Sequence, residues 1–462
     1  MALSNTVQHP VSRQPALVGR RFYLLLTLCF FAMTAAFYVR ASAIPPIGDS
    51  IGYMAMAKDI SIIGVMAVHR MSDIRTIGYP TFIALVAKCP LPLEPAQTVV
   101  LAQAVLYWLV ASLLLGLSRG LLAYRRSRRL LGVGLFLNPL PALYCSEILT
   151  EGLSLVALAA CMTVILALAR NRRKPARRVY LLFSLGLIAG LALIVRPANL
   201  GLVLASLACT AIPPLFSHAP LMRRLIDSAA GLLPVLVGVY IAASPQIASN
   251  WKYYDKATPL PTFELGKFQV HEGIQILKYG TLATAPVLRI WIVNPFVEKT
   301  VVRNDDGFEW YQRNPGRGLL TMAGHVFATL VQDPLYCYVV DLKPWYLPLV
   351  ILINAFVVVV GLGGLLGLSW RHRRSAVSMP AAWFVLATLG ASMAIAAISA
   401  AESRFGLQTL SIAFVAACLA VGRASQLRSR PGLLVAGIAA SLVFIFLALK
   451  LGDLAIVLPP HH

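Results

Sequence analysis

Apolar stretches long enough to cross a bilayer dominate the sequence and limit what the chain can fold into. A membrane-spanning helix needs roughly 17–25 mostly apolar residues. Eleven segments meet this length, at 22–43, 96–118, 130–146, 151–169, 179–195, 199–217, 226–245, 346–369, 380–400, 405–422 and 431–457. The weakest is 130–146, because it contains Asn138, Pro139 and Pro141. The sequence predicts an all-α integral membrane protein with about eleven transmembrane helices.

Composition supports the membrane class and excludes two others. Hydrophobic residues make up 58% of the 462 residues, and only 13% are charged, about half the usual share in soluble proteins. A soluble globular enzyme and a disordered chain are both excluded. A net charge of +22 would otherwise indicate nucleic acid. In so apolar a chain, the charge is better explained by membrane topology.

The basic residues assign the sides of the membrane. Lys and Arg cluster in short segments on one side of the predicted spans, at 13–21, 119–129, 170–178, 223–224, 371–374 and 423–430. The positive-inside rule makes this side cytoplasmic. It places the N-terminal segment 1–21 inside and the C-terminus outside. The apolar run of 22–43 exceeds a usual signal-peptide core, so we expect a retained anchor rather than cleavage at Ala41-Ser42-Ala43.

The predicted organisation gives two large outer segments. An N-terminal transmembrane module, 22–245, includes the first outer loop, 44–95, where we expect short interfacial helices. The second outer segment, 246–345, is long enough for a small subdomain and contains an amphipathic stretch at 318–332. The C-terminal helices fill 346–462. Of 18 Asp and Glu residues, only Asp227 falls on the cytoplasmic side. Either the outer loops are simply longer, or chemistry occurs on the outer face.

Candidate functional residues begin in the first outer loop. Asp49 and Tyr53 are four residues apart and share one face of a predicted short helix. Asp49 is either an ordinary helix cap or an ionised general base. Arg75 precedes Gly78-Tyr79-Pro80 and an apolar half-helix at 81–89. It either extends to the interface like many membrane arginines or binds an anion.

The short outer loops supply the remaining candidates. Glu147 and Glu151 lie one helical turn apart at a membrane boundary, where an unpaired carboxylate is costly. Either they merely stand at the start of the next helix, or they have a functional role. Arg196 is the only cation of its loop. Glu402 and Arg404 either pair with each other, or Arg404 joins Arg196 in binding a phosphate, which suits the guanidinium group.

Taken in order, these motifs resemble the GT-C superfamily of multispan glycosyltransferases. The similarity is to the bacterial branch related to protein mannosyltransferases and lipid A aminoarabinose transferases. The motifs that carry it are Asp49-Ser50…Tyr53…Ala57, Arg75…Gly78-Tyr79-Pro80, Leu149-Thr150-Glu151, Arg196-Pro197 and Glu402-Ser403-Arg404-Phe405. The resemblance covers the membrane part to about residue 422. It does not include 246–345.

The resemblance implies an activity and roles for the candidates. The enzyme would transfer a monosaccharide from a polyprenyl-phosphate carrier to an acceptor hydroxyl, with inversion, at the periplasmic face of the bacterial inner membrane. Asp49 would be the catalytic base, and three arginines would bind the donor phosphate: Arg75, Arg196 and Arg404. The half-helix would border a groove for the lipid tail. Substrate contacts are assigned to Tyr53, Tyr79, Glu147, Glu151 and Glu402.

The sequence also departs from the family and leaves alternatives open. Many relatives carry an acidic pair in the first loop, whereas Ser50 follows Asp49 here. A metal site and other cofactors are therefore not indicated, although a divalent metal stays open. The acceptor is an unidentified envelope glycan, lipid or protein, and nucleic acid is not expected as a partner. A lipid-linked glycan ligase or polymerase remains an alternative, as does a transporter or flippase of lipid-linked sugars.

Overall fold

The computed structural model describes most of the chain. The described residues are 19–41, 49–65, 74–120, 122, 125–171, 174–217, 219–262, 265–282, 288–297, 307–331, 347–371, 379–421 and 431–458. Several predicted features lie outside them in whole or in part. These are the N-terminal segment up to residue 18, the cleavage motif at 41–43, the end of the outer segment at 332–345, and some cations of the predicted cytoplasmic loops.

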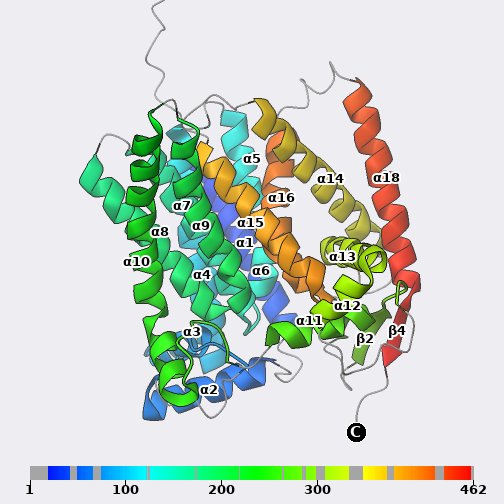
Figure 1. Cartoon of the computed structure of the whole chain (residues 1–462), viewed down its shortest axis with the longest axis horizontal. Coiled ribbons are helices and arrows are strands. Elements are labelled where there is room, and N and C mark those ends of the chain that lie inside the picture. The colour runs from blue at the N-terminus through cyan, green and yellow to red at the C-terminus, as the bar shows by residue number, and fades with distance from the viewer. Residues whose placement is uncertain are drawn as a thin grey trace, which may run out of the picture.

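Ten helices within the described residues are long and apolar enough to cross a membrane. They are α1 (Arg20–Ala41), α4 (Pro95–Leu117), α7 (Thr150–Arg170), α8 (Pro175–Val195), α9 (Leu200–Leu215), α10 (Leu221–Tyr254), α14 (Leu347–Arg371), α15 (Met379–Ile398), α16 (Leu407–Val421) and α18 (Pro431–Asp453). They form one bundle (Figure 1). The predicted polytopic, helical membrane fold is confirmed.

The segment predicted as a span at 130–146 is divided into two shorter helices. These are α5 (Arg125–Phe136) and α6 (Pro139–Cys145), which follow one another down the bundle in Figure 1. The break occurs because Asn138 caps α6, accepting the N–H of Leu140 on its side-chain oxygen, and Pro139 supplies no N–H for a continuous helix. Neither helix is long enough to cross a membrane by itself, so the eleventh span stays a prediction.

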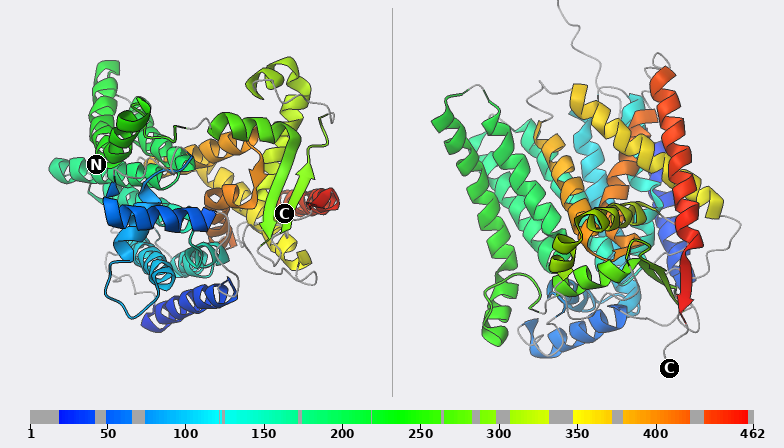
Figure 2. Two further views of the ribbon diagram at one scale, coloured as in Figure 1. Left: turned by 90° about the horizontal axis from the view of Figure 1, so that it is seen from below. Right: turned by 45° about the vertical axis from the view of Figure 1, so that its right-hand side comes forward.

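Short helices lie across the bundle at one end, which is the lower end in Figure 1. From the first outer loop come α2 (Asp49–Ile63) and α3 (Gly78–Val86). From the second outer segment come α11 (Leu265–Gln275), α12 (Gly307–Arg313) and α13 (Pro315–Leu330). Seen from below in Figure 2, α2 occupies one half of this end, and α11 with the strands occupies the other. The helices expected at 49–60 and 318–332 therefore form.

A small four-stranded sheet, which the sequence analysis did not anticipate, lies at the same end. Its order is β3 (Ala401–Glu402), β1 (Ile276–Leu282), β2 (Leu288–Val293) and β4 (Ala455–Leu458). β1 runs antiparallel to β2 and parallel to β3, and β4 pairs with β2. The sheet joins the second outer segment to the loop before α16 and to the end of the described chain. The last strand thus lies at the same end as α2, as the predicted odd number of crossings requires.

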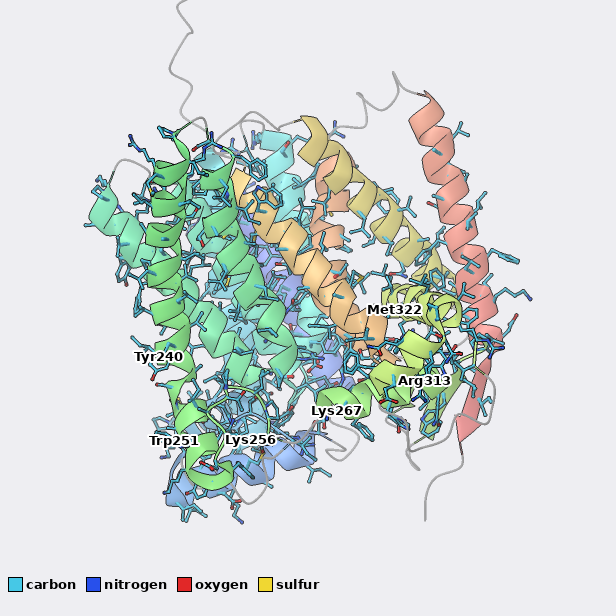
Figure 3. The ribbon with its side chains drawn as sticks, in the orientation of Figure 1. Tyr240, Trp251, Lys256, Lys267, Arg313 and Met322 are labelled. Carbon is cyan, nitrogen blue, oxygen red and sulfur yellow. The ribbon has the colours of Figure 1, made fainter. Side chains whose placement is uncertain are left out.

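Side chains at this lower end mark its boundary with the aqueous phase. Figure 3 shows Trp251 and Lys256 at the lower end of α10, and Lys267 and Arg313 near the same level on the other side. Trp251 is 67% exposed. Exposed Trp and basic side chains are typical of the level of lipid head groups. α10, with 34 residues, is about 51 Å long and extends below the apolar layer.

Helices α8 and α10 pack closely against each other, because glycines allow their backbones to meet. A Cβ added at Gly186 would collide with the carbonyl oxygen of Val235, and one at Gly238 with that of Phe183. Small residues at membrane helix interfaces permit such packing, which substitutes for the hydrophobic effect between helices in lipid. This contact fixes α8, whose lower end carries Arg196.

We expect Gly186→Ala to lower the thermal unfolding temperature of the purified protein in detergent. The added methyl group meets backbone, so overpacking should cost about 1–3 kcal/mol. Gly437→Ala in α18 is the matched control, because nothing lies within 4 Å of its added Cβ. That change should leave stability equal or raise it slightly, since alanine favours helix. Equal effects of the two substitutions would contradict the backbone contact.

Candidate functional site

Six charged side chains gather at the lower end of the bundle, which we call the cluster end. They come from α2, the turn before α3, the start of α7, the end of α8, and the β3 loop before α16. The charged cluster consists of Asp49, Arg75, Glu151, Arg196, Glu402 and Arg404. Its three guanidinium groups and three carboxylates balance in charge.

Asp49 is held by two arginines, one on each carboxylate oxygen. Arg75 Nη2 donates to Asp49 Oδ1 at 2.8 Å, and Arg404 Nη1 donates to Oδ2 at 3.1 Å. The Asp49 side chain is 29% exposed, so it lies at the accessible edge of the cluster. Both oxygens are occupied by guanidinium groups, so Asp49 does more than begin α2.

Arg404 connects Asp49 to the buried acids. Its Nε donates to Glu402 Oε2 at 2.6 Å, and its Nη1 lies 3.5 Å from Glu151 Oε1. Arg196 Nη1 donates to the same Glu151 oxygen at 2.6 Å. Glu151 and Glu402 are each 1% exposed, whereas Arg196 and Arg404 are 14% exposed. The acids therefore form the floor of the cluster, and the arginines face outward from it.

Two glycines position the loops that bring these residues together. An added Cβ at Gly52 would lie 2.8 Å from Nη1 of Arg75, so glycine leaves room for the guanidinium to cross α2 toward Asp49. At Gly78, an added Cβ would meet the backbone of Ile194 and Val195 at the end of α8. The first outer loop is thereby seated against the helix end that carries Arg196.

Aromatic rings pack against the guanidinium groups. The guanidinium carbons of Arg196 and Arg404 lie 5.5 and 5.9 Å from the ring centre of Phe405. That of Arg75 lies 5.3 Å from the ring centre of Tyr53. Such cation–π contacts hold an arginine without using its N–H donors. The N–H groups of these arginines thus remain directed at the carboxylates of the cluster.

Tyr79, a predicted substrate contact, is enclosed by the protein in this structure. Its ring is fully buried, and its hydroxyl donates to Gln103 Oε1 at 3.1 Å. The ring of Tyr53 meets it edge-on at 5.0 Å. A side chain enclosed in this way supports Tyr53 rather than a ligand. Gly78-Tyr79-Pro80 also forms the first turn of α3, not a turn before it.

Glu147 lies beside the cluster rather than in it. Gln103 Nε2 donates to the backbone carbonyl of Glu147 at 2.9 Å and so fixes this loop to α4. Burial, and then the charge of Glu151, raise the pKa of Glu147 to about 7. Glu147 therefore titrates near neutral pH, unlike an ordinary glutamate.

Several polar residues inside the helices buttress the site, and the sequence analysis did not single them out. The Ile77 N–H donates to Gln246 on α10 at 2.8 Å, which anchors the turn after Arg75. Gln408 on α16 donates to Asn199 at 2.7 Å, and Asn199 donates to Ser154 on α7. An amide within an apolar span is itself a signal of a structural or functional partner.

The electrostatics keep Asp49 ionised. Burial alone would raise the pKa of Asp49, but Arg404 and Arg75 outweigh it, so the pKa lies below its ordinary value. Burial, with the negative charge of Asp49, raises the pKa of Tyr53 to about 12. Tyr53 thus remains a hydrogen-bond donor at neutral pH. Within the described residues, no group of three or more His, Cys, Asp or Glu side chains has the arrangement of a metal site.

We expect Arg196→Met to destabilise the protein strongly, because it removes the nearest partner of buried Glu151. Breaking a buried ion pair typically costs about 3–5 kcal/mol. Adding Glu151→Gln should recover part of the loss, since no unpaired charge then remains. Thermal unfolding of both single variants and the double variant would give the coupling. A double variant no more stable than Arg196→Met alone would argue against this pairing.

The raised pKa of Glu147 predicts that the stability of the protein depends on pH. Its pKa is higher in the folded protein than in the unfolded chain, so the folded state binds the proton more tightly. Stability should fall as pH rises from about 4.5 through 7. Glu147→Gln should remove this contribution and be more stable than the wild type at pH 8, on the order of 1–3 kcal/mol. Melting curves from pH 5 to 8, with exposed Glu309→Gln as the control, test this, and identical pH profiles would contradict it.

Comparison with known proteins gives limited information. No protein-family model matches the chain, and no curated protein is similar to it. Among solved structures, the chain is similar to an oligosaccharyltransferase from Archaeoglobus fulgidus tethered to an acceptor peptide through a disulfide bond. The TM-score is 0.45 and the identity 13%, over 94% of this chain and 54% of the other. The chain thus spans about half the length of that protein, and the activity must be argued from its own residues.

Proposed function

We propose that the protein is a membrane glycosyltransferase that moves a monosaccharide from a polyprenyl-phosphate carrier to an acceptor hydroxyl. The reaction takes place at the cluster end, which the positive-inside rule predicts to face away from the cytoplasm. In the bacterial inner membrane that the resemblance implies, this is the periplasmic side. The observation that carries this proposal is the placement of Asp49. It is an ionised carboxylate at the accessible edge, held by two arginines that a phosphate could also bind.

Donor binding begins with an exchange of partners at the arginines. Guanidinium groups bind phosphate and carboxylate with the same two-pronged geometry. A phosphate that reaches Arg75 and Arg404 competes directly with Asp49 for their N–H groups. Glu402 and Glu151 stay behind the arginines and hold them in place. In this proposal the two buried acids position arginines and do not contact substrate themselves.

The exchange also makes Asp49 a better base. Arg404 and Arg75 are the groups that lower the pKa of Asp49. When they turn to the phosphate, that effect weakens and the affinity of Asp49 for a proton rises. A base is most effective when its pKa approaches the working pH. Binding of the donor thus prepares Asp49 for the acceptor.

The transfer itself requires one bond to form and one to break. Asp49 takes the proton from the acceptor hydroxyl as its oxygen bonds to the anomeric carbon of the sugar. The bond from that carbon to the phosphate oxygen breaks, and the electron pair leaves with the polyprenyl phosphate. The arginines stabilise the charge that grows on this leaving group. Attack opposite the leaving group inverts the anomeric carbon. Tyr53, beside Arg75 and Asp49, is placed to donate to the sugar.

The position of the cluster separates this proposal from the transporter alternative. Transporters bind their substrates near the middle of the membrane, often at broken helices. The charged cluster instead lies at helix ends, beside α2 and the small sheet. This placement favours a reaction at the membrane surface. A ligase that uses a lipid-linked oligosaccharide would share the same arginines and differ in the size of its donor.

Asp49→Asn should abolish sugar transfer by the purified protein while preserving its fold and its binding of the donor. Asparagine keeps the size of the side chain and can still begin a helix. It cannot accept the proton, and losing a general base typically lowers the rate by about 10²–10⁴. The assay measures transfer from a lipid-linked sugar, with donor binding measured in parallel.

Asp59→Asn is the matched control, because Asp59 belongs to the same helix but not to the charged cluster. It should transfer sugar at the wild-type rate. Near-normal transfer by Asp49→Asn would show that another group is the base. Translocation of the lipid-linked sugar by the wild type, without transfer to any acceptor, would favour the flippase instead.

A further inference from the structure

A cavity of about 290 Å³ lies at the end of the bundle opposite the charged cluster. It is formed where α7 and α9 end and where α8 and α15 begin. The positive-inside rule predicts that this end faces the cytoplasm. Its lining is mostly apolar, with Ile165, Leu168 and Leu182 among its walls, and Arg178 is the one charged residue among the described residues that line it. Nothing in the proposed reaction uses it.

The end of α9 explains why the helices do not close this space. Pro213 and Pro214 stand side by side in its last turn, and both line the cavity. Proline supplies no N–H, so the carbonyls of Cys209 and Thr210 lose their usual donors four residues on. Cys209 and Thr210 line the same cavity.

The described charged residues around the cavity are mostly basic. Arg170, Lys174 and Arg177 lie near Arg178 in the α7–α8 connection, and all are exposed. Among the described residues, no carboxylate pairs with Arg178. The only acid on this predicted side of the membrane is Asp227. A ligand with a negative group at the rim and an apolar part inside would complement both features.

The level of the cavity is that of lipid head groups. Phe216, just after α9, stacks on Trp383 in the first turns of α15, with ring centres 6.0 Å apart and planes at 10°. Both aromatic residues follow closely on prolines that line the cavity. Tryptophan is enriched at the membrane–water interface. The apolar interior of the cavity therefore opens where a lipid changes from head group to acyl chain.

We propose that this cavity binds an anionic glycerophospholipid of the leaflet at that end, with its phosphate on Arg178 and part of an acyl chain between the helices. Basic pockets between transmembrane helices are known sites for acidic lipid head groups. The cavity is too small for a whole lipid, so the second chain stays in the bilayer. This binding does not depend on the proposed reaction.

The bound lipid would brace the helices that hold the charged cluster. Glu151 lies at the start of α7, Arg196 at the end of α8, and Glu402 just after α15. The same three helices, with α9, frame the cavity at their opposite ends. A molecule wedged among them fixes their spacing. It is therefore a structural lipid of the bundle, rather than part of a surface layer.

The test is retention of defined lipids by the purified, delipidated full chain, measured by native mass spectrometry. The probes are phosphatidylglycerol and phosphatidylcholine with identical acyl chains. The wild type should retain one phosphatidylglycerol with at least about tenfold preference. Arg178→Gln should weaken that binding by about tenfold, the effect of losing one charge-assisted contact. Ala169→Phe, which fills the cavity without changing charge, should weaken binding of both lipids.

Arg223→Gln is the matched control, because Arg223 is an exposed cation at the same end that does not line the cavity. It should retain phosphatidylglycerol like the wild type. Equal losses in Arg223→Gln and Arg178→Gln would overturn the proposal, since they would indicate diffuse attraction to the basic surface. Equal retention of the two lipids by the wild type would overturn it as well. So would preferential retention of polyprenyl phosphate over phosphatidylglycerol in a parallel titration.

Discussion

The position of Arg404 among three carboxylates is the interaction on which the rest of this structure depends. Its guanidinium contacts Asp49 from the first outer loop, Glu402 from its own loop and Glu151 from α7. Asp49 and Arg404 are 355 positions apart in the chain. A buried acid is costly unless it is paired, so Glu151 requires the arginines, and the arginines in turn hold α2 over the end of the bundle. The same contacts therefore hold α2 in position and compensate the charge of the buried acids.

The sequence predicted the parts of this arrangement that leave a local signal. The charged residues at the span ends predicted the members of the cluster, whereas the sides of the membrane, which rest on the cations of the short loops, stay a prediction. The pairing of the cluster members could not be predicted, because each motif by itself also allowed a purely structural role. For Glu402 and Arg404 the structural role is also correct, since the two side chains do pair with each other. The functional interpretation rests instead on a further contact, the bond of Arg404 to Asp49. That contact depends on the packing of helices that are far apart in sequence.

Other features left no signal at the sequence level, for identifiable physical reasons. β3 has two residues and β4 has four, too few for an alternating pattern to be recognised. The sheet depends on pairing between distant segments, which sequence periodicity does not report. Gln103 was visible as a polar residue within an apolar span, and Gln246 lies just after one, yet both also bond to backbone groups of loops, which the sequence does not report. Tyr79 was singled out for its motif, but its complete burial depends on packing that the motif does not report.

The bundle therefore has two chemically different ends joined by the same helices. Within the charged cluster, three guanidinium groups and three carboxylates balance, so a phosphate that arrives there must compete with carboxylates that are already bound. At the opposite end, cations such as Arg178 stand without acidic partners among the described residues, so an anionic head group meets no such competition. This difference matches the two proposals, in which one end takes a substrate that must bind and leave and the other a lipid that stays. Because α7, α8 and α15 run between the two, whatever sets their spacing at one end also sets the distances among Glu151, Arg196 and Glu402 at the other.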